Sequence, residues 1–325
     1  MRLFALHGMQ VLGHSVAQSI GVELDRIEER EFPDGEHKSR PLVSVRNEDV
    51  YVMASLHGDD GQSPADRFVR LLFFIGACRD NGASRVTAVT PYLAFMRKEQ
   101  QTKPRDPVNS RYVAELLEAV GTDMVVTLEV HNPAAFQNAF RCGNTHLDTR
   151  QLFAGKIEAL AAGRPVVLLS PDSGGMRRVN LLRETYKATG AREAGLAMME
   201  KHRSEGVVSG DLFAGDVEGA DVFVVDDMIA SGGTMLRAAT ACRARGAAHV
   251  YALATHGLFS EGSDKLFEGP DFDKVIVTDS VPSARLSPEN TGGKLEVVSC
   301  APLLGDAIQR LHSGGSIHRL LNPQP

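Results

Sequence analysis

The sequence predicts an α/β protein with two tandem domains, each built on a mainly parallel sheet flanked by helices. Short β-branched runs alternate with stretches of helical periodicity, which is typical of parallel strands joined by helices. The alternation restarts near the middle of the chain. The length of 325 residues also fits two domains, at about 150 residues each.

The first half of the chain contains alternating strands and helices. Met1–Ala5 is a short strand-like run, and DVYVMASL has the composition of a buried strand. The next segment has apolar residues at helical spacing, among them Phe68, Leu71 and Ile75. In chain order, the predicted strand, helix, strand, helix and strand are Asp49–Leu56, Ser63–Asn81, Ser84–Thr90, Asn109–Ala119 and Asp123–Val130.

The restart predicts a boundary between domains 1–147 and 148–325, with the last helix able to pack back on the first domain. No linker rich in Pro, Gly or Ser separates the halves, so closely packed domains are expected. The predicted helices are Arg150–Ala162, Met176–Ala188, Gly233–Gly246 and Pro302–Ser313. The predicted strands are Pro165–Ser170, Ala197–Met199, Asp221–Val225, His249–Ala254, Lys274–Thr278 and Leu295–Ser299.

Composition excludes several classes of protein. Lys and Arg number 35 and Asp and Glu 41, so the net charge of −6 argues against a nucleic-acid binder that works through overall positive charge. No apolar run reaches the roughly 18 residues of a membrane helix, and the N-terminus lacks the features of a signal peptide. The cysteines are far apart and form no C-x-x-C pair, which predicts reduced thiols in a cytoplasmic protein without membrane or nucleic-acid partners.

The strongest chemical signal is VFVVDDMIASGGT, residues 222–234. An apolar run ends in the acid pair Asp226 and Asp227, and a Ser-Gly-Gly-Thr turn then leads into a helix. Ligands bind at the carboxyl ends of strands in open α/β sheets, and glycine N–H groups at a helix N-terminus favour phosphate. Carboxylates suit ribose hydroxyls instead, directly or through Mg²⁺. The segment therefore predicts a sugar-phosphate site at Asp226, Asp227, Ser231, Gly232, Gly233 and Thr234.

This segment resembles the phosphoribosyl diphosphate-binding motif of phosphoribosyltransferases and ribose-phosphate pyrophosphokinases. From near residue 30 to the last helix, the chain resembles the ribose-phosphate pyrophosphokinase (phosphoribosyl pyrophosphate synthetase) family. The motifs that carry this resemblance are FPDGE (32–36), RKEQQTKPRDP (97–107), SPDSGG (170–175) and GDVEG (215–219), in the family's order. The resemblance implies two phosphoribosyltransferase-like domains. It also implies transfer of the β,γ-diphosphoryl group of ATP to the anomeric hydroxyl of ribose 5-phosphate, giving phosphoribosyl diphosphate and AMP.

The same resemblance assigns the remaining site residues. The ATP-binding residues would be Phe32, Asp34, Glu36, Arg97, Lys98, Glu99 and Arg105. Lys201 and Arg203, in a polar segment expected to be a closing loop, would stabilise the transition state, and His131 with Asp172 would hold Mg²⁺. Because no P-loop motif is present, the cations that phosphoryl transfer needs must come from such segments. The resemblance also implies self-association as a homo-oligomer, from dimer to hexamer.

Two other functions remain open. A phosphoribosyltransferase would need only the segment 226–234, and would not need the FPDGE turn or the basic segment at 97–107. A catalytically silent, regulatory relative would tend to lose Lys201, Arg203, His131 or Asp172. All four are present, so the sequence favours the active diphosphokinase.

Overall fold

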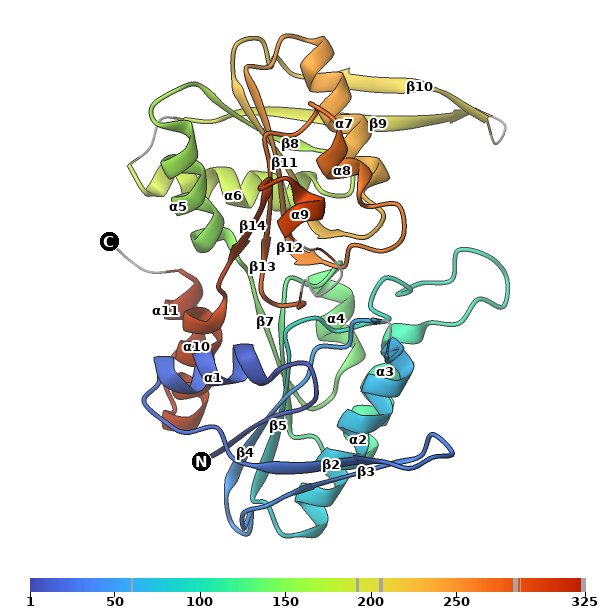
Figure 1. Cartoon of the computed structure of the whole chain (residues 1–325), viewed down its shortest axis with the longest axis vertical. Helices are drawn as coiled ribbons and strands as arrows, with labels where there is room; N and C mark the ends of the chain where they lie inside the picture. Colours follow the sequence, from blue (N-terminus) through green and yellow to red (C-terminus); the bar gives the residue numbers. More distant parts are fainter. Residues whose placement is uncertain (60, 191–192, 205–206, 283–285, 287, 323–325) are drawn as a thin grey trace. The chain divides into compact units, whose positions relative to one another are not determined.

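The computed structural model describes residues 1–59, 61–190, 193–204, 207–282, 286 and 288–322. The chain divides into two compact units, shown in Figure 1. The first comprises Met1–Asp148, Ser280–Pro282 and Ser299–Pro325, so it includes the C-terminal helices. The second comprises Thr149–Asp279 and Ser283–Val298. Each unit is built on a mainly parallel sheet with flanking helices, which confirms the predicted fold class.

The first unit contains a five-stranded parallel sheet in the order β1-β4-β5-β6-β7. Its strands β4, β5 and β6 are buried almost throughout, which explains their continuous apolar sequences. The bounds are β1 Arg2–Ala5, β4 Asp49–Met53, β5 Arg85–Thr90, β6 Met124–Leu128 and β7 Gly143–Leu147.

Helices α2 (Pro64–Asp80) and α3 (Asn109–Ala119) pack through apolar side chains against the same face of this sheet. Helix α2 begins where the sequence predicts because Ser63 and Asp66 form a reciprocal capping box. Helix α4 (Pro133–Ala139) packs beside α3, and α1 (Gln10–Ser19) packs along α10 (Ala301–Ser313), as Figure 1 shows. Helix α11 (Ile317–Leu321) follows α10.

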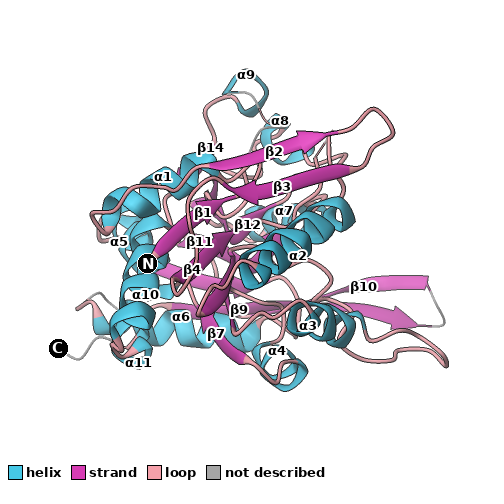
Figure 2. Cartoon of the chain, turned by 90° about the horizontal axis from the view of Figure 1, so that it is seen from below, coloured by secondary structure: helices cyan, strands magenta, loops and turns pink. Residues whose placement is uncertain are grey.

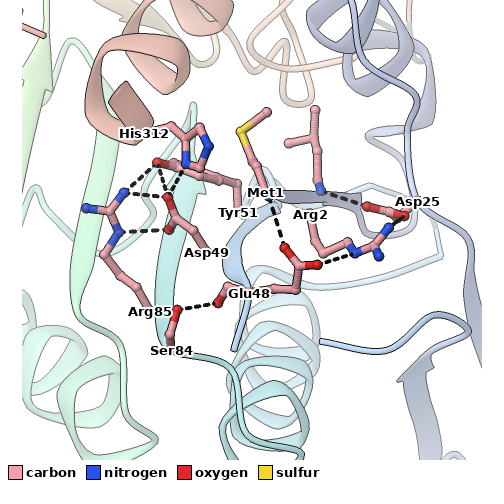
Figure 3. A network of polar contacts seen from close by, with 10 residues as sticks. Met1, Arg2, Asp25, Glu48, Asp49, Tyr51, Ser84, Arg85 and His312 are labelled. Carbon is pink, nitrogen blue, oxygen red and sulfur yellow. Dashed lines mark hydrogen bonds and ion pairs between the residues drawn. The ribbon is translucent and has the colours of Figure 1, made fainter. Parts of the chain in front are cut away.

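A polar network joins α10 to the amino ends of β4 and β5 (Figure 3). Arg85 donates to both carboxylate oxygens of Asp49, at 2.8 and 2.5 Å, and to the carbonyl oxygen of Leu311 at 3.0 Å. His312 lies 2.7 Å from the same carboxylate, through Nδ1. The Tyr51 hydroxyl completes the network, 2.9 Å from the Arg85 guanidinium. Helix α10 is thus attached to the sheet of the first unit by charged hydrogen bonds.

A separate β-hairpin, β2 (Ile27–Glu31) and β3 (His37–Pro41), belongs to the first unit and packs on α2 (Figures 1 and 2). No strand is predicted here from the sequence. The two strands read IEERE and HKSRP, and none of their residues is fully buried, so neither shows an apolar pattern. Their pairing depends on the backbone ladder and on contacts with α2.

The second unit contains a seven-stranded sheet in the order β10-β9-β8-β11-β12-β13-β14. Neighbouring strands are parallel except for β9 and β10, which pair antiparallel. The bounds are β8 Val166–Ser170, β9 Gly195–Ser204, β10 Val207–Ala214, β11 Asp221–Ile229, β12 His249–Gly257, β13 Lys274–Thr278 and β14 Leu295–Val298. The helices are α5 Arg150–Ala161, α6 Met176–Ala188, α7 Gly233–Ala244, α8 Lys265–Glu268 and α9 Pro288–Thr291.

Strand β11 lies at the centre of this unit and is covered on both faces. Val222 and Val224 pack in the apolar cluster that includes α7. Phe223 and Val225 pack in the cluster that includes α5 and α6. Because successive side chains point to opposite faces, the run VFVV is apolar at every position. Burial on both faces therefore fixes the position of the acids that follow.

The segment 199–206, expected from the sequence to be a closing loop, is strand in its described part. Strand β9 continues through Ser204, and β10 runs antiparallel to it. Beyond Met198, β9 pairs with β10 alone. A backbone ladder between two strands needs no apolar side chains, so the polar sequence EKHRS carries no strand signal.

In the part of the chain that the structure describes, no helix is long and apolar enough to span a bilayer.

Candidate active site

The acid pair lies near the carboxyl end of β11. Asp227 is almost fully buried and Asp226 partly buried, and the backbone N–H of Asp227 donates to Oδ1 of Asp226 at 2.8 Å. Burial raises the pKa of Asp226, and the neighbouring Asp227 carboxyl raises it further. Two adjacent buried carboxyls are costly in a folded protein, so this position is a candidate for ligand binding.

Arg178, on α6, also contacts this pair and is not among the site residues predicted from sequence. Its guanidinium lies 3.4 Å from Oδ1 of Asp226 and 3.9 Å from Oδ1 of Asp227, and it opposes the rise in the pKa of Asp226. One signal was available: Arg178 occurs in the first turn of a helix, where the macrodipole disfavours a cation. A basic residue at that position indicates a role outside helix stability.

The turn after β11 requires glycine at position 232. Gly232 has φ +76°, a left-handed conformation that favours glycine. A Cβ atom there would also lie 2.6–2.8 Å from Leu266 side-chain carbons, which is too close. Helix α7 begins at Gly233 without a side-chain cap, so its first N–H groups are available at the helix N-terminus. The exposed Ser231 and half-buried Thr234 add hydroxyls beside these groups. This arrangement suits a phosphate group.

The SPDSGG segment lies at the same edge of the sheet. It follows β8, which is the neighbour of β11. Ser170 Oγ donates to the carbonyl oxygen of Asp172 at 2.7 Å, and Asp172 Oδ1 accepts from Gly175 N–H at 2.9 Å. A Cβ on Gly175 would lie 2.5 Å from Ser170 Oγ, so this turn also needs glycine. The Asp172 side chain is exposed at the edge where Asp226 and Asp227 lie.

Lys201 and Arg203 lie on the part of β9 that continues past this edge. Strand β9 is parallel to β8, and Met198 is the partner of Ser170, the last residue of β8. At about 3.3 Å per residue, Lys201 is about 10 Å farther along the strand than Met198. The backbone therefore carries both residues beyond the carboxyl edge that bears Asp172 and the acid pair.

In the first unit, the segment after β5 meets the segment after β6. Asn132, which caps α4, donates from Nδ2 to Oε1 of Glu99 at 2.8 Å. The other oxygen, Oε2 of Glu99, is buried and has no hydrogen bond to a described residue. His131 precedes Asn132 and is exposed. Strands β5 and β6 are parallel neighbours, so His131 and Glu99 lie at one sheet edge.

The basic residues of the 97–107 segment differ in their surroundings. The Lys98 ammonium is 2.5 Å from the Asp106 carboxylate and 2.8 Å from the Thr102 hydroxyl. Several contacts, of which the hydrogen bond from Lys98 has the largest effect, lower the pKa of Asp106 to about 2. Arg97 and Arg105 are exposed and make no ion pair with a residue that the structure describes. Their charges are therefore available to an anionic ligand, whereas the charge of Lys98 is already paired.

Phe32, Asp34 and Glu36 lie in the turn between β2 and β3. Gly35 has φ +89°, and the N–H of Glu36 donates to Oδ1 of Asp34 at 3.1 Å. Arg30 lies over the Phe32 ring, 5.0 Å from its centroid. Among the described residues, no hydrogen bond, ion pair or ring contact joins this turn to the 97–107 segment. The two nucleotide-binding segments predicted from sequence are thus separate within the chain.

The described residues form no large cluster of metal-binding side chains. No group of three or more His, Cys, Asp or Glu side chains suited to a metal occurs in the described ranges. Mg²⁺ commonly keeps several waters and takes one or two carboxylates together with substrate phosphates. An exposed carboxylate with one oxygen already fixed, as in Asp172, fits that role.

Comparison with known proteins agrees with this geometry. Residues 1–121 match the family model described as the N-terminal domain of ribose phosphate pyrophosphokinase. Residues 205–322 match the phosphoribosyl synthetase-associated domain. A protein of Enterococcus faecalis named "Putative ribose-phosphate pyrophosphokinase 1" is 30% identical over 326 residues, covering 100% of this chain and 96% of its own. A ribose-phosphate pyrophosphokinase of Listeria ivanovii is 30% identical over 321 residues, covering 98% and 96%.

Solved structures show the same relationship. The crystal structure of phosphoribosylpyrophosphate synthetase from Mycobacterium smegmatis superposes with a TM-score of 0.85 at 30% identity. The match covers 97% of this chain and 99% of that one. Full-length similarity in both sequence and fold, together with the acid pair and glycine turn, leads to one conclusion. This chain belongs to the ribose-phosphate pyrophosphokinase family.

Proposed function

We propose that the protein transfers the β,γ-diphosphoryl group of ATP to the anomeric hydroxyl of ribose 5-phosphate, forming phosphoribosyl diphosphate and AMP. The observation that carries this proposal is the buried acid pair beside a glycine turn and a helix N-terminus, in a chain of this family. Carboxylates accept hydrogen bonds from sugar hydroxyls, and the N–H groups of α7 bind phosphate. One edge of the second unit therefore offers both halves of a ribose 5-phosphate site.

Ribose 5-phosphate would bind with its ring over the acids and its phosphate at the turn. Asp226 and Asp227 would accept hydrogen bonds from the ribose hydroxyls. Ser231, Gly232, Gly233 and Thr234 would donate to the 5-phosphate through hydroxyls and backbone N–H groups. This orientation leaves the anomeric carbon free to face the ATP phosphates, as the reaction requires.

ATP would bind through the first unit. The exposed Arg97 and Arg105 guanidinium groups suit phosphate oxygens, and the buried Oε2 of Glu99 can accept from the adenine amino group. Phe32 offers an aromatic face to a base, with Asp34 and Glu36 as acceptors nearby. Lys98 would reach a phosphate only by exchanging its contact with Asp106.

Catalysis in this proposal depends on positive charge that is held near the transferred group. Negative charge develops on phosphate oxygens in the transition state, and nearby cations stabilise it. Lys201 and Arg203, on the extended part of β9, would supply that charge. His131 and Asp172 would hold Mg²⁺, which when bound neutralises phosphate oxygens and orients the diphosphoryl group.

The proposal also includes self-association as a homo-oligomer. Among the described residues of one chain, no hydrogen bond, ion pair or ring contact joins the FPDGE turn to the 97–107 segment. A second copy that contributes one of these two segments would bring them to the same nucleotide. Size-exclusion chromatography with light scattering would show whether the protein is a monomer, which would contradict this part of the proposal.

The test is ³¹P NMR of the purified protein with ATP, Mg²⁺ and ribose 5-phosphate. Equal growth of AMP and phosphoribosyl diphosphate signals would establish diphosphoryl transfer. Formation of ADP would indicate transfer of a single phosphoryl group and contradict the mechanism. Binding of both substrates without turnover would favour the catalytically silent relative. The Lys201→Ala protein is the matched control for contaminating activity.

A further inference from the structure

Both ends of the FPDGE turn contact helix α2. Glu31 ends β2 immediately before the turn, and His37 begins β3 immediately after it; the two residues are register partners. The Arg70 guanidinium donates to Oε1 of Glu31 at 2.6 Å. The Phe73 ring stacks on His37, with centroids 5.3 Å apart and planes at 17°. Arg70 and Phe73 are three positions apart and therefore neighbours on one face of the helix.

The hairpin needs such contacts because it belongs to neither large sheet. Among the described strands, β2 and β3 pair with each other alone, and an isolated two-stranded hairpin is marginally stable in water. Figures 1 and 2 show it lying along α2. The direction in which the turn points is therefore set largely by what α2 presents to it.

The contact made by Arg70 is costly to lose. Its side chain is only 10% exposed, and within the described ranges its ion pair is with Glu31. The Glu31 side chain is 63% exposed, so Arg70 is the buried partner. Loss of Glu31 would leave the Arg70 charge uncompensated, whereas loss of Arg70 would release this end of the turn from α2. The amide of Gln62 also donates to the same Glu31 oxygen, at 3.4 Å. Glu31 therefore accepts from two residues at the N-terminal half of the α2 region.

The second contact explains an exposed aromatic residue. Phe73 is 58% exposed, on a helix whose other phenylalanines are buried. Burial, and then Arg70, lower the pKa of His37. A neutral imidazole stacks on an aromatic ring without the cost of desolvating a charge. The stack thus fixes the first residue of β3, as the ion pair fixes the last residue of β2.

We propose that Arg70 and Phe73 are positioning residues that clamp the two ends of the FPDGE turn and aim it at bound nucleotide. This inference rests on the proposed function, which assigns the turn to ATP. Neither residue touches the substrate. Both act through Glu31 and His37, so their loss should affect the nucleotide and leave ribose 5-phosphate unaffected.

The test uses the full-length variants Arg70→Met and Phe73→Ala. The KM for ATP should rise at least about tenfold, because a misplacement of about 1 Å can cost about a hundredfold. The kcat and the KM for ribose 5-phosphate should stay within about twofold of wild type, since the clamp acts on ATP binding. Amide exchange in residues 27–41 should become faster in both variants.

Matched controls separate positioning from general stability. Arg79→Met removes another paired arginine from α2. Arg79 lies in the last turn of the helix, and its partner is Asp123, 3.0 Å away. Tyr112→Ala removes a partly exposed aromatic residue from α3. Neither should change the KM for ATP. The single variants Glu31→Arg and Arg70→Glu should each raise the KM for ATP. The charge-swapped double variant Glu31→Arg/Arg70→Glu should return it towards the wild-type value.

Three results would overturn the clamp. The first is an unchanged KM for ATP and unchanged amide exchange in both variants. The second is an equal rise of the KM for ATP in the control Arg79→Met. The third is a parallel loss of kcat and of affinity for both substrates in Arg70→Met and Phe73→Ala. If wild type forms no AMP, the proposed function fails. The clamp is then decided by ATP affinity from calorimetry and by the exchange data, with the same expected directions.

Discussion

Arg85 connects the sheet of the first unit to helix α10. Replacing Arg85 by methionine should weaken that connection measurably. The guanidinium donates to both oxygens of Asp49, to the Tyr51 hydroxyl and to the carbonyl oxygen of Leu311. Breaking a buried pair costs about 3–5 kcal/mol. The Arg85 side chain is 37% exposed, and His312 continues to contact Asp49. We therefore expect a loss of about 2 kcal/mol.

The pH dependence of this loss has a definite sign. Burial raises the pKa of Asp49, but hydrogen bonds from Arg85 and then His312 outweigh it, so the net pKa is lowered. A carboxyl with a lowered pKa in the folded state stabilises the fold above its unfolded pKa, about 3.9. That stabilisation disappears as the pH falls through the lower folded value. The difference between wild type and Arg85→Met should therefore be constant above about pH 5 and shrink below about pH 4.

The assay is native-state amide exchange of residues 301–313, because a protein with two units need not unfold in one step. The control is Arg111→Met, whose pair with Glu115 has side chains 62% and 61% exposed. Such an exposed pair contributes about 0.5 kcal/mol or less. The reasoning would be refuted if the amides of α10 were as well protected from exchange in Arg85→Met as they are in Arg111→Met. If the stability difference between wild type and Arg85→Met were as large at pH 3 as at neutral pH, the pH dependence could not be assigned to Asp49.

Three further predictions test other parts of the molecule. Lys201→Ala should lower turnover by at least about a hundredfold with an unchanged Tm, and normal turnover would remove it from the catalytic set. Asp227→Ala should weaken ribose 5-phosphate binding, measured by calorimetry, and a change in ATP affinity alone would contradict its assignment. Ser63→Ala should cost about 1 kcal/mol by removing the α2 capping box, as seen in urea unfolding, whereas Ser84→Ala, outside any helix cap, should cost less.

The sequence predicted the central strands well because burial on both faces leaves a simple signal. In β11 every residue from Val222 to Val225 is apolar, since the strand is covered by α7 on one face and by α5 and α6 on the other. Where burial is incomplete, the signal disappears. The hairpin of β2 and β3 and the outer part of β9 form through backbone pairing and local contacts. Their polar sequences are indistinguishable from loops by periodicity.

The candidate site was predictable where chemistry and local sequence coincide. Asp226, Asp227 and the glycine turn are contiguous, and their order along the chain places them at one sheet edge. Arg178 comes from a different element, and its distance of 3.4 Å to Asp226 depends on how α6 packs against the sheet. Lys98 shows the opposite case, because its sequence suggests a free cation and the fold pairs it with Asp106.

The acid pair at this edge of the sheet costs stability, which favours a functional role for it. Burial, and then the neighbouring Asp227 carboxyl, raise the pKa of Asp226 above its ordinary value. A fold selected for stability alone would place uncharged residues there. The Arg178 guanidinium, 3.4 Å from Oδ1 of Asp226 and 3.9 Å from Oδ1 of Asp227, offsets part of the repulsion. The contact that makes the pair tolerable in the fold thus lies at the position where the proposed function places the sugar.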